Sequence, residues 1–258
     1  PVVAGGGDGQ VCGLGLGVLT PGTAYLSLGS GAVCGIHVPR YRHDLGFRTL
    51  VSPSGEGFIL ETCLRTCTQL VDWVVTLTGR TLDELVAAAA DVAPGADGLL
   101  LVPYWSGVMS PYWDDTARGT VTGLGLDHGP GHLFRAALEG VALEQAVAPD
   151  ALERAGGVRA RELVVTGGGA TSSLWGEIVS SVLGRPLRRP PIADAGCLGA
   201  AILAAAGAGW HGSIAAAAET IVPTGGETFG PRPDWVAAYA TILARYRKIH
   251  PALATVRR

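Results

Sequence analysis

The sequence predicts an α/β fold that forms one compact unit. Two observations support this: three strand-like segments precede the first long helical pattern, and a strand, a glycine turn and a helix follow one another between residues 162 and 183. The 258 residues are 48% hydrophobic and contain no low-complexity linker. The chain is therefore long and apolar enough to bury a large core.

The first half of the chain predicts a short helix, then strands, then two longer helices. Residues 9–19 are small, apolar and rich in glycine, which favours a short helix packed closely on its neighbours. Apolar alternation predicts strands at 23–28, 32–38 and 57–62. Helical periodicity covers 64–77 and 82–91. Thr81, followed three positions later by Glu84, predicts a capping box for the second of these helices.

The second half alternates between short strands and helices. Strands are expected at 99–103, 120–124, 162–166 and 186–190. Helices are expected at 131–155, 172–183, 196–207 and 234–250. An aromatic, turn-rich loop at 104–115 joins the first two of these strands.

Charge, cysteine usage and hydropathy exclude several classes of protein. The net charge is −3 and only 16% of residues are charged, which gives no electrostatic reason to expect nucleic acid or an anionic membrane as a partner. No apolar run is long enough to span a membrane. The five cysteines are odd in number, lack CxxC spacing and have apolar neighbours, which predicts reduced core thiols and a cytoplasmic protein.

Three single positions bear on the extent and chemistry of the chain. The sequence begins at Pro1 without an initiator, and its one methionine, Met109, is internal, so we expect it to be part of a longer protein. Its one lysine is Lys248, near the end. A phosphate-binding loop that ends in a glycine-lysine pair is therefore excluded.

Three glycine-rich turns are candidate anion sites, because backbone N–H groups in such turns approach an oxyanion closely. Each follows an apolar, strand-like segment; they are Gly5-Gly-Gly-Asp8, Gly29-Ser30-Gly31 and Gly167-Gly168-Gly169-Ala170. Tight turns without a ligand are the alternative for any one of them. None has the GxGxxG spacing and later acid of a dinucleotide site.

Asp8 is the most distinctive acid, since glycines on both sides leave its carboxylate able to reach a ligand. A helix N-cap is an alternative role, and the two are compatible. Phosphoryl transfer needs one acid to accept a hydroxyl proton and donors to hold phosphates. We expect Glu139 and Glu144, on one helix with Arg135, to form surface ion pairs.

Metal-dependent and serine hydrolase chemistry are poorly supported. His128 and His132 lie across Gly129-Pro-Gly131, which breaks the helix that would align them, so no metal ligands are assigned. The segment Leu28-Gly29-Ser30-Gly31 lacks the first glycine of the GxSxG motif.

Taken together, five segments resemble the C-terminal half of the FGGY carbohydrate kinases, and xylulokinase-like members most of all. The resemblance covers nearly the whole chain. The matching segments are Gly5 to Gln10, Tyr25 to Gly31, Gly119 to Leu124 with His132 to Gly140, Gly167 to Trp175, and Asp194 to Ala204.

The resemblance implies an actin-like, ribonuclease-H-like ATPase lobe, with residues 1–258 forming the C-terminal nucleotide-binding lobe. An N-terminal sugar-binding lobe would lie outside this chain. Asp8 would be the catalytic base and contact the substrate hydroxyl. Gly29, Ser30 and Gly31 would hold phosphate oxygens, and Gly167, Gly168, Gly169, Ala170 and Ser172 would seat the nucleoside.

The resemblance also implies the reaction and its participants. The expected activity is ATP-dependent phosphorylation of a ketopentose or related sugar or polyol, with Mg²⁺ accompanying ATP. The expected partners are the sugar, ATP and the missing lobe, with a second copy of the chain as a further candidate. The isolated chain is expected to be inactive.

Two segments depart from the family pattern. Gly107-Val-Met-Ser110-Pro111 stands where many relatives carry a Gly-Glu-Arg-Thr/Ser-Pro run, and this bears on which sugar is used. Ser30-Gly31 replaces a pair of hydroxyl residues, and this bears on phosphate affinity. A catalytically silent nucleotide-binding or regulatory module of the same fold is the main alternative, and a purely structural lobe is a third.

Overall fold

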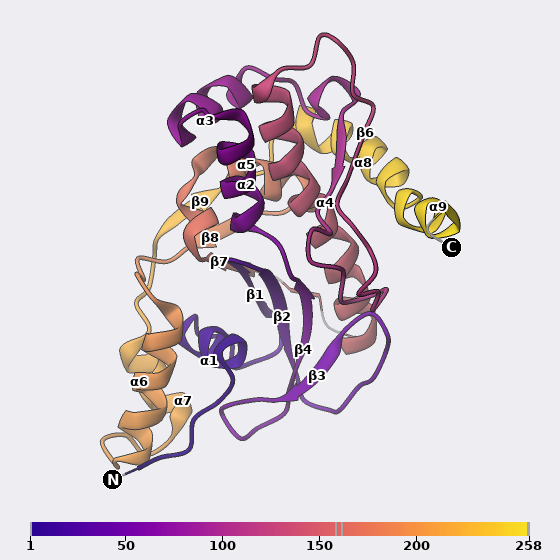
Figure 1. Ribbon diagram of the computed structural model, residues 1–258. Helices are drawn as coiled ribbons and strands as arrows, with labels where there is room; N and C mark the ends of the chain where they lie inside the picture. Colours follow the sequence, from indigo (N-terminus) through magenta and orange to yellow (C-terminus); the bar gives the residue numbers. More distant parts are fainter. Residues whose placement is uncertain (1, 158, 161, 257–258) are drawn as a thin grey trace.

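Seven strands in the described part of the chain form one mixed sheet, with helices on both faces (Figure 1). The computed structural model describes residues 2–157, 159–160 and 162–256, and all their side chains except those at 148–151 and 256. Pro1, at which the sequence begins, lies outside the described residues. The strand order is β3-β4-β2-β1-β7-β8-β9, and β5 pairs separately with β6.

The strands are β1 (Thr23–Leu28), β2 (Ala32–Val38), β3 (Arg48–Val51), β4 (Phe58–Leu64), β5 (Leu100–Val102), β6 (Thr120–Thr122), β7 (Glu162–Thr166), β8 (Leu187–Arg189) and β9 (Glu227–Phe229). The α-helices are α1 (Asp8–Gly15), α2 (Thr68–Thr78), α3 (Leu82–Ala90), α4 (Pro130–Gly156), α5 (Ser173–Leu183), α6 (Ala195–Gly207), α7 (Ile214–Ile221), α8 (Pro233–Tyr246) and α9 (Ile249–Val256). Short 3₁₀ turns lie at Ala96–Gly98 and Gly168–Thr171.

The sheet changes from antiparallel to parallel at its centre. β1, β2, β4 and β3 pair in this order and are all antiparallel to their neighbours, whereas β1 and β7 run parallel, with Ser27 opposite Thr166. β7 and β8 are also parallel. The carboxyl ends of β1 and β7 therefore lie side by side at one edge of the sheet, where α/β proteins commonly bind ligands.

Alternation along β1 divides the core between the two faces of the sheet. Leu26 and Leu28 pack in the larger cluster, which includes α4 residues such as Leu138. Tyr25 points to the opposite face and packs near α1, together with Ile59. Figure 1 shows α1 and α6 on this second side, with α2, α4 and α5 on the first.

The contact between α1 and α6 is unusually close because glycines lie on both helices. A Cβ atom on Gly15 would collide with the backbone oxygen of Ala195. A Cβ atom on Gly199 would collide with the backbone oxygen of Val11. The two backbones therefore touch without side chains between them, as the small-residue pattern of residues 9–19 led us to expect.

Most predicted elements are confirmed, and the errors have local causes. The Thr81–Glu84 capping box forms in both directions. The helix expected from residue 64 begins at Thr68, because β4 continues through Leu64. The helix expected over 234–250 ends at Tyr246, and a separate helix, α9, begins at Ile249 with Pro251 in its first turn. Elements β3, α7, β9 and α9 were not predicted.

The prediction of surface ion pairs on α4 is wrong. Arg135 and Glu139 are both buried and joined by an Nε–Oε1 bond of 2.7 Å, and Tyr239 of α8 donates its hydroxyl to Glu139. Glu144 is also buried and accepts hydrogen bonds from Tyr104 and Tyr246. The prediction that all five cysteines lie in the core is likewise wrong, because Cys197 is exposed.

Burial raises the pKa of Glu144 to about 7, although the hydroxyls of Tyr246 and Tyr104 act to lower it. The folded chain therefore binds this proton more tightly than the unfolded chain, whose carboxyl has the ordinary value of 4.5. The contribution of Glu144 to the free energy of unfolding is therefore greatest below pH 4.5, and it is lost as the pH rises to 7.

Replacing Glu144 with glutamine should remove that loss. Between pH 4.5 and pH 8, the free energy of unfolding of Glu144→Gln should rise relative to the parent by about 3 kcal/mol. Urea denaturation across this pH range measures the difference. The exposed Glu219→Gln variant on α7 serves as control and should follow the parent, and parallel curves for Glu144→Gln would contradict the assignment.

Candidate active site

Two of the three glycine-rich turns meet at the carboxyl ends of β1 and β7. A Cβ atom on Gly167 would lie 2.6 Å from the carbonyl carbon of Leu28 and 3.0 Å from the nitrogen of Gly29. Gly167 also has φ of +90°, a conformation that side chains disfavour. The first loop, 29–31, and the second, 167–170, are thus in backbone contact and form one continuous glycine surface.

The 29–31 loop is fixed to the start of α2. The carbonyl of Ser30 accepts the N–H of Cys67 at 2.7 Å, and that of Gly29 accepts the N–H of Thr68 at 3.0 Å. A Cβ atom on Gly31 would lie 2.7 Å from the Leu64 carbonyl oxygen. Glycine at position 31, one of the departures from the family pattern, is therefore required by this close approach.

The 167–170 loop leads through a 3₁₀ turn into α5. Ser172 is the N-cap of α5, and its hydroxyl accepts the N–H of Trp175 at 3.3 Å. The Trp175 ring packs beneath Gly169, so closely that a Cβ atom there would lie 2.7 Å from the ring. Gly168, by contrast, faces open space.

A hollow of about 290 Å³ lies beside this loop, between α2, α3, α4 and α5. Its walls are mainly apolar, from Val71, Val86, Phe134, Leu138 and Trp175. Polar groups from Thr68, Asp72 and Ser172 stand among them. An apolar slot with a few polar groups, next to a glycine loop, suits a purine ring.

A second hollow, of about 390 Å³, lies where Gly167 and Gly168 face the segment 189–193. Arg189 lines it and donates to the carbonyl oxygen of Ala170 at 2.8 Å, while also pairing with Glu227. The glycine surface therefore has an apolar hollow and a more polar one, with Gly168 common to both.

Asp8 is the first residue of α1. The N-cap of this helix is Gly7, so the alternative role of Asp8 as N-cap is wrong. Its Oδ1 accepts the N–H of Gly9 at 2.8 Å. The exposed carboxylate lines an open hollow of about 570 Å³, together with Gly5, Gly6 and Asp194, the N-cap of α6.

The charge of Asp8 reaches two cysteines on this face of the sheet. Burial raises the pKa of Cys12 to about 11, and the charges of Asp194 and Asp8 act in the same direction. The pKa of Cys63 is also raised, first by burial, with Asp8 among the charges that act on it. Cys63 lies opposite Val33, two residues beyond Gly31.

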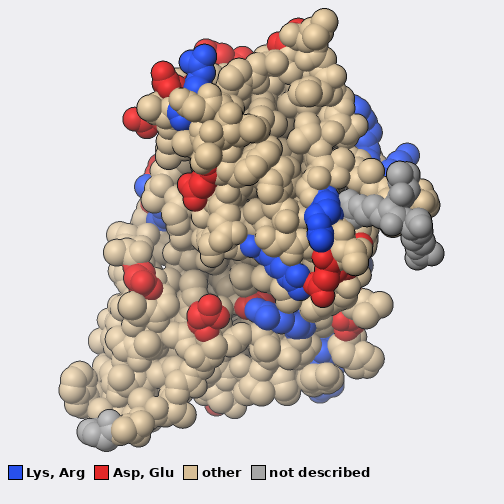
Figure 2. All heavy atoms as spheres, in the orientation of Figure 1, with Lys and Arg blue, Asp and Glu red and all other residues tan. Residues whose placement is uncertain are grey.

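Charged atoms on this side of the molecule are few (Figure 2). Figure 2 shows a surface largely without charge, on which basic and acidic atoms lie next to one another near the centre. Arg65, which follows β4, pairs with Asp115 at 2.6 Å and donates to the carbonyl oxygen of Ser106. Arg48 of β3 pairs with Glu61 of β4.

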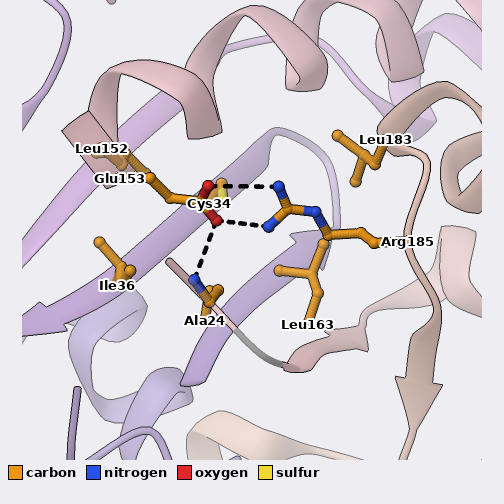
Figure 3. Close-up of a pocket in the computed structure, with 9 residues that line it drawn as sticks. Ala24, Cys34, Ile36, Leu152, Glu153, Leu163, Leu183 and Arg185 are labelled. Carbon is orange, nitrogen blue, oxygen red and sulfur yellow. Dashed lines mark hydrogen bonds and ion pairs between the residues drawn. The ribbon is translucent and has the colours of Figure 1, made fainter. Parts of the chain in front are cut away.

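A small cavity elsewhere in the fold is unsuited to a ligand. It has a volume of about 10 Å³ and lies among Ala24, Cys34 and Leu163 (Figure 3). An ion pair between Glu153 and Arg185 covers it, and burial raises the pKa of Cys34 to about 12. Space for one water molecule at most excludes a nucleotide or sugar there.

Several residues around the site were not singled out in the sequence. Glu61 is the clearest, because a charged residue at the middle of the apolar strand Phe58–Leu64 is a signal in itself.

The structure also brings together the rings of His128 and His132, 5.2 Å apart, despite the glycines between them. Each Nδ1 accepts a backbone N–H, from Gly125 and Gly129.

The mixed sheet and the paired glycine loops at its centre define an actin-like ATPase lobe. Residues 24–208 match the FGGY family of carbohydrate kinases, C-terminal domain. The chain belongs to this family. The sequence resemblance and the predicted fold class are thereby confirmed.

Relatives of two kinds are similar to this chain. Glycerol kinase from Aromatoleum aromaticum is 35% identical over 224 residues, which is 82% of this chain and 44% of that protein. Xylulose kinase from Lactococcus lactis is 28% identical over 254 residues, 96% of this chain and 50% of that protein. The chain thus spans about half the length of the curated relatives it matches.

Solved structures agree on the fold. A xyloylose kinase from Brucella ovis superposes with a TM-score of 0.88 at 25% identity, covering 97% of this chain and 51% of that one. Plasmodium falciparum glycerol kinase with ADP has a TM-score of 0.77 at 20% identity, covering 93% of this chain and 50% of that one.

Among the described helices, none combines the length and apolar character needed to cross a membrane.

Proposed function

We propose that this chain is the C-terminal, nucleotide-binding lobe of an ATP-dependent carbohydrate kinase and that it supplies the catalytic base. The backbone contact between the 29–31 and 167–170 loops, beside an apolar hollow, carries the proposal. Backbone N–H groups at strand ends suit phosphate oxygens, and the hollow suits a purine. An N-terminal lobe that holds most of the sugar belongs to the same proposal.

Each site residue has a distinct role in the proposed transfer. Asp8 accepts the proton of the substrate hydroxyl as that oxygen attacks the γ-phosphorus, and ADP leaves with the bridging oxygen. Gly29, Ser30 and Gly31 hold phosphate oxygens. The nucleoside lies against Gly167, Gly168, Gly169, Ala170 and Ser172.

In this proposal, Mg²⁺ binds together with ATP, and the part of the chain that the structure describes does not provide a set of side chains that holds the ion. Among the described residues, no group of three or more His, Cys, Asp or Glu side chains is arranged to hold a metal ion. The donor set here therefore does not form a complete magnesium site, and the role of each residue above is independent of one.

The substrate we propose is a ketopentose or a smaller polyol. Relatives named glycerol kinase and xylulose kinase support both classes. Gly107-Val-Met-Ser110-Pro111, which departs from the family pattern, is the segment that bears on which sugar is used.

Measuring ADP release by the full-length kinase with a panel of pentuloses, glycerol and other polyols tests the activity. One substrate class should give turnover well above the rate without acceptor. Nucleotide binding with no turnover on any acceptor would instead support the catalytically silent module. Failure to bind ATP or ADP, even with both lobes present, would support a purely structural lobe.

Replacing Gly168 with valine should weaken nucleotide binding without loss of stability. A side chain at 168 meets no protein atom within 4 Å and enters the space shared by the two hollows. We expect the Kd for ADP to rise at least tenfold, or about 1.4 kcal/mol, while Tm stays unchanged. Calorimetry of the full-length kinase measures both quantities. Gly212→Val, also in open space but remote from the loop, is the control, and an unchanged Kd for Gly168→Val would contradict the nucleotide's position.

A further inference from the structure

A row of side chains crosses the sheet beneath the first turn of α1. Arg48, Glu61, Gly35 and Tyr25 are directly opposite one another on β3, β4, β2 and β1. Gly35 has no side chain, so the Tyr25 ring passes over β2 to reach β4. Its hydroxyl donates to Oε2 of Glu61 at 2.6 Å, and Nε of Arg48 donates to Oε1 at 2.6 Å.

Helix α1 rests on this row through two glycines four positions apart. A Cβ atom on Gly9 would lie 2.6 Å from Oε2 of Glu61, and one on Gly13 would lie 2.8 Å from the Tyr25 ring. Residues at i and i+4 share one face of a helix, so this face of α1 lies directly on the row. The height of α1 above the sheet is therefore set by Glu61 and Tyr25.

The Glu61 carboxylate cannot easily move away. Its side chain has no exposed surface, and its two oxygens are held by Arg48 of β3 and Tyr25 of β1. Burial and the charge of Glu61 raise the pKa of Tyr25 above its ordinary value, so the tyrosine remains a hydrogen-bond donor. Buried charged groups often contribute little net stability compared with apolar residues, so stability alone does not account for an acid in this apolar strand.

We infer that Glu61, held by Arg48 and Tyr25, is a positioning residue for Asp8. The inference rests on the proposed function, in which Asp8 is the catalytic base. Gly9, the residue that contacts Glu61, is the direct neighbour of Asp8 and donates its N–H to the Asp8 carboxylate. A displacement of Gly9 by a fraction of an ångström therefore moves the base away from the acceptor hydroxyl.

The test is a double-mutant cycle in the full-length kinase. Gly9→Ala places a methyl group against the fixed carboxylate and raises the first turn of α1. We expect kcat to fall by about 10- to 100-fold, the scale of a misplaced catalytic group, with the KM for ATP unchanged. Glu61→Asp shortens the side chain, so the combination of Gly9→Ala and Glu61→Asp should recover a large part of the lost kcat.

Glu139→Asp is the matched control, because Glu139 is also a buried carboxylate held by an arginine and a tyrosine. It should lower stability but leave kcat at the parental value. Three outcomes would overturn the inference. Gly9→Ala could keep the parental kcat, or it could lose kcat that Glu61→Asp does not restore. The third is a loss of kcat in Glu139→Asp equal to that in Gly9→Ala. Near-normal turnover by Asp8→Asn would instead overturn the proposed role of Asp8 as base, so the two failures are distinguishable.

Discussion

Replacing Asp8 with asparagine should abolish turnover of the full-length kinase while sparing its affinity for nucleotide. Asparagine has nearly the same shape and can still accept the N–H of Gly9, but it cannot take up the hydroxyl proton. We expect kcat to fall by about 10²- to 10⁴-fold, the range for loss of a general base. The 29–31 and 167–170 loops are unaltered, so the Kd for ADP should remain at the parental value.

ADP-release kinetics together with calorimetry check this result. Asp234→Asn provides the control, since Asp234 is also an acid in the first turn of a helix, α8, and is exposed. It should behave as the parent does. Near-normal turnover by Asp8→Asn would remove Asp8 from the role of base.

Replacing Arg135 with methionine should cause the largest loss of stability. The guanidinium is fully buried, bonds to Glu139 at 2.7 Å and to the Tyr239 hydroxyl at 2.9 Å, and lies 4.4 Å from the centre of the Trp235 ring. Methionine fills much of the space but leaves the Glu139 charge uncompensated. Removing one partner of a buried pair lowers the free energy of unfolding by about 3–5 kcal/mol.

The loss should depend on pH in a defined direction. Burial raises the pKa of Glu139, and Arg135 is the strongest influence that lowers it. Without Arg135 the pKa rises further, so protonation relieves part of the strain, and the loss should be smaller at pH 5 than at pH 8. Urea denaturation at both pH values measures it, with the exposed Arg245→Met on α8 as control. A loss no greater than that of the control would contradict the role assigned to this pair.

Local sequence signals predicted those parts of the structure that depend on neighbouring residues. The Thr81–Glu84 capping box and the glycine turns at strand ends are formed within a few residues, so their patterns were sufficient. Asp8 became the candidate for the base in the same way, from the glycines that flank it, and this role stays a prediction. The short β3 and β9 strands carry too few residues for alternation to be recognised.

Contacts across long stretches of chain could not be predicted in this way. Glu139 and Glu144 are acids on an apolar helix, and their burial depends on Tyr239 and Tyr246, about a hundred residues later. The row beneath α1 likewise needs the register of β3, β4, β2 and β1 to bring Arg48, Glu61 and Tyr25 together. No local sequence pattern contains that register. An isolated acid in an apolar strand, such as Glu61, indicates only that a buried polar contact is formed there.

The backbone contact of α1 with α6, at Gly15 and Gly199, restricts how these helices can move in the two-lobed kinase that we propose. Sliding of packed helices requires a layer of side chains that can exchange rotamers, and these two helices have none where they touch. Helix α1, which carries Asp8, and helix α6 should therefore move as one rigid body. Any hinge between open and closed forms has to lie outside this pair, and the distance between Asp8 and the N-terminus of α6 is then the same in both.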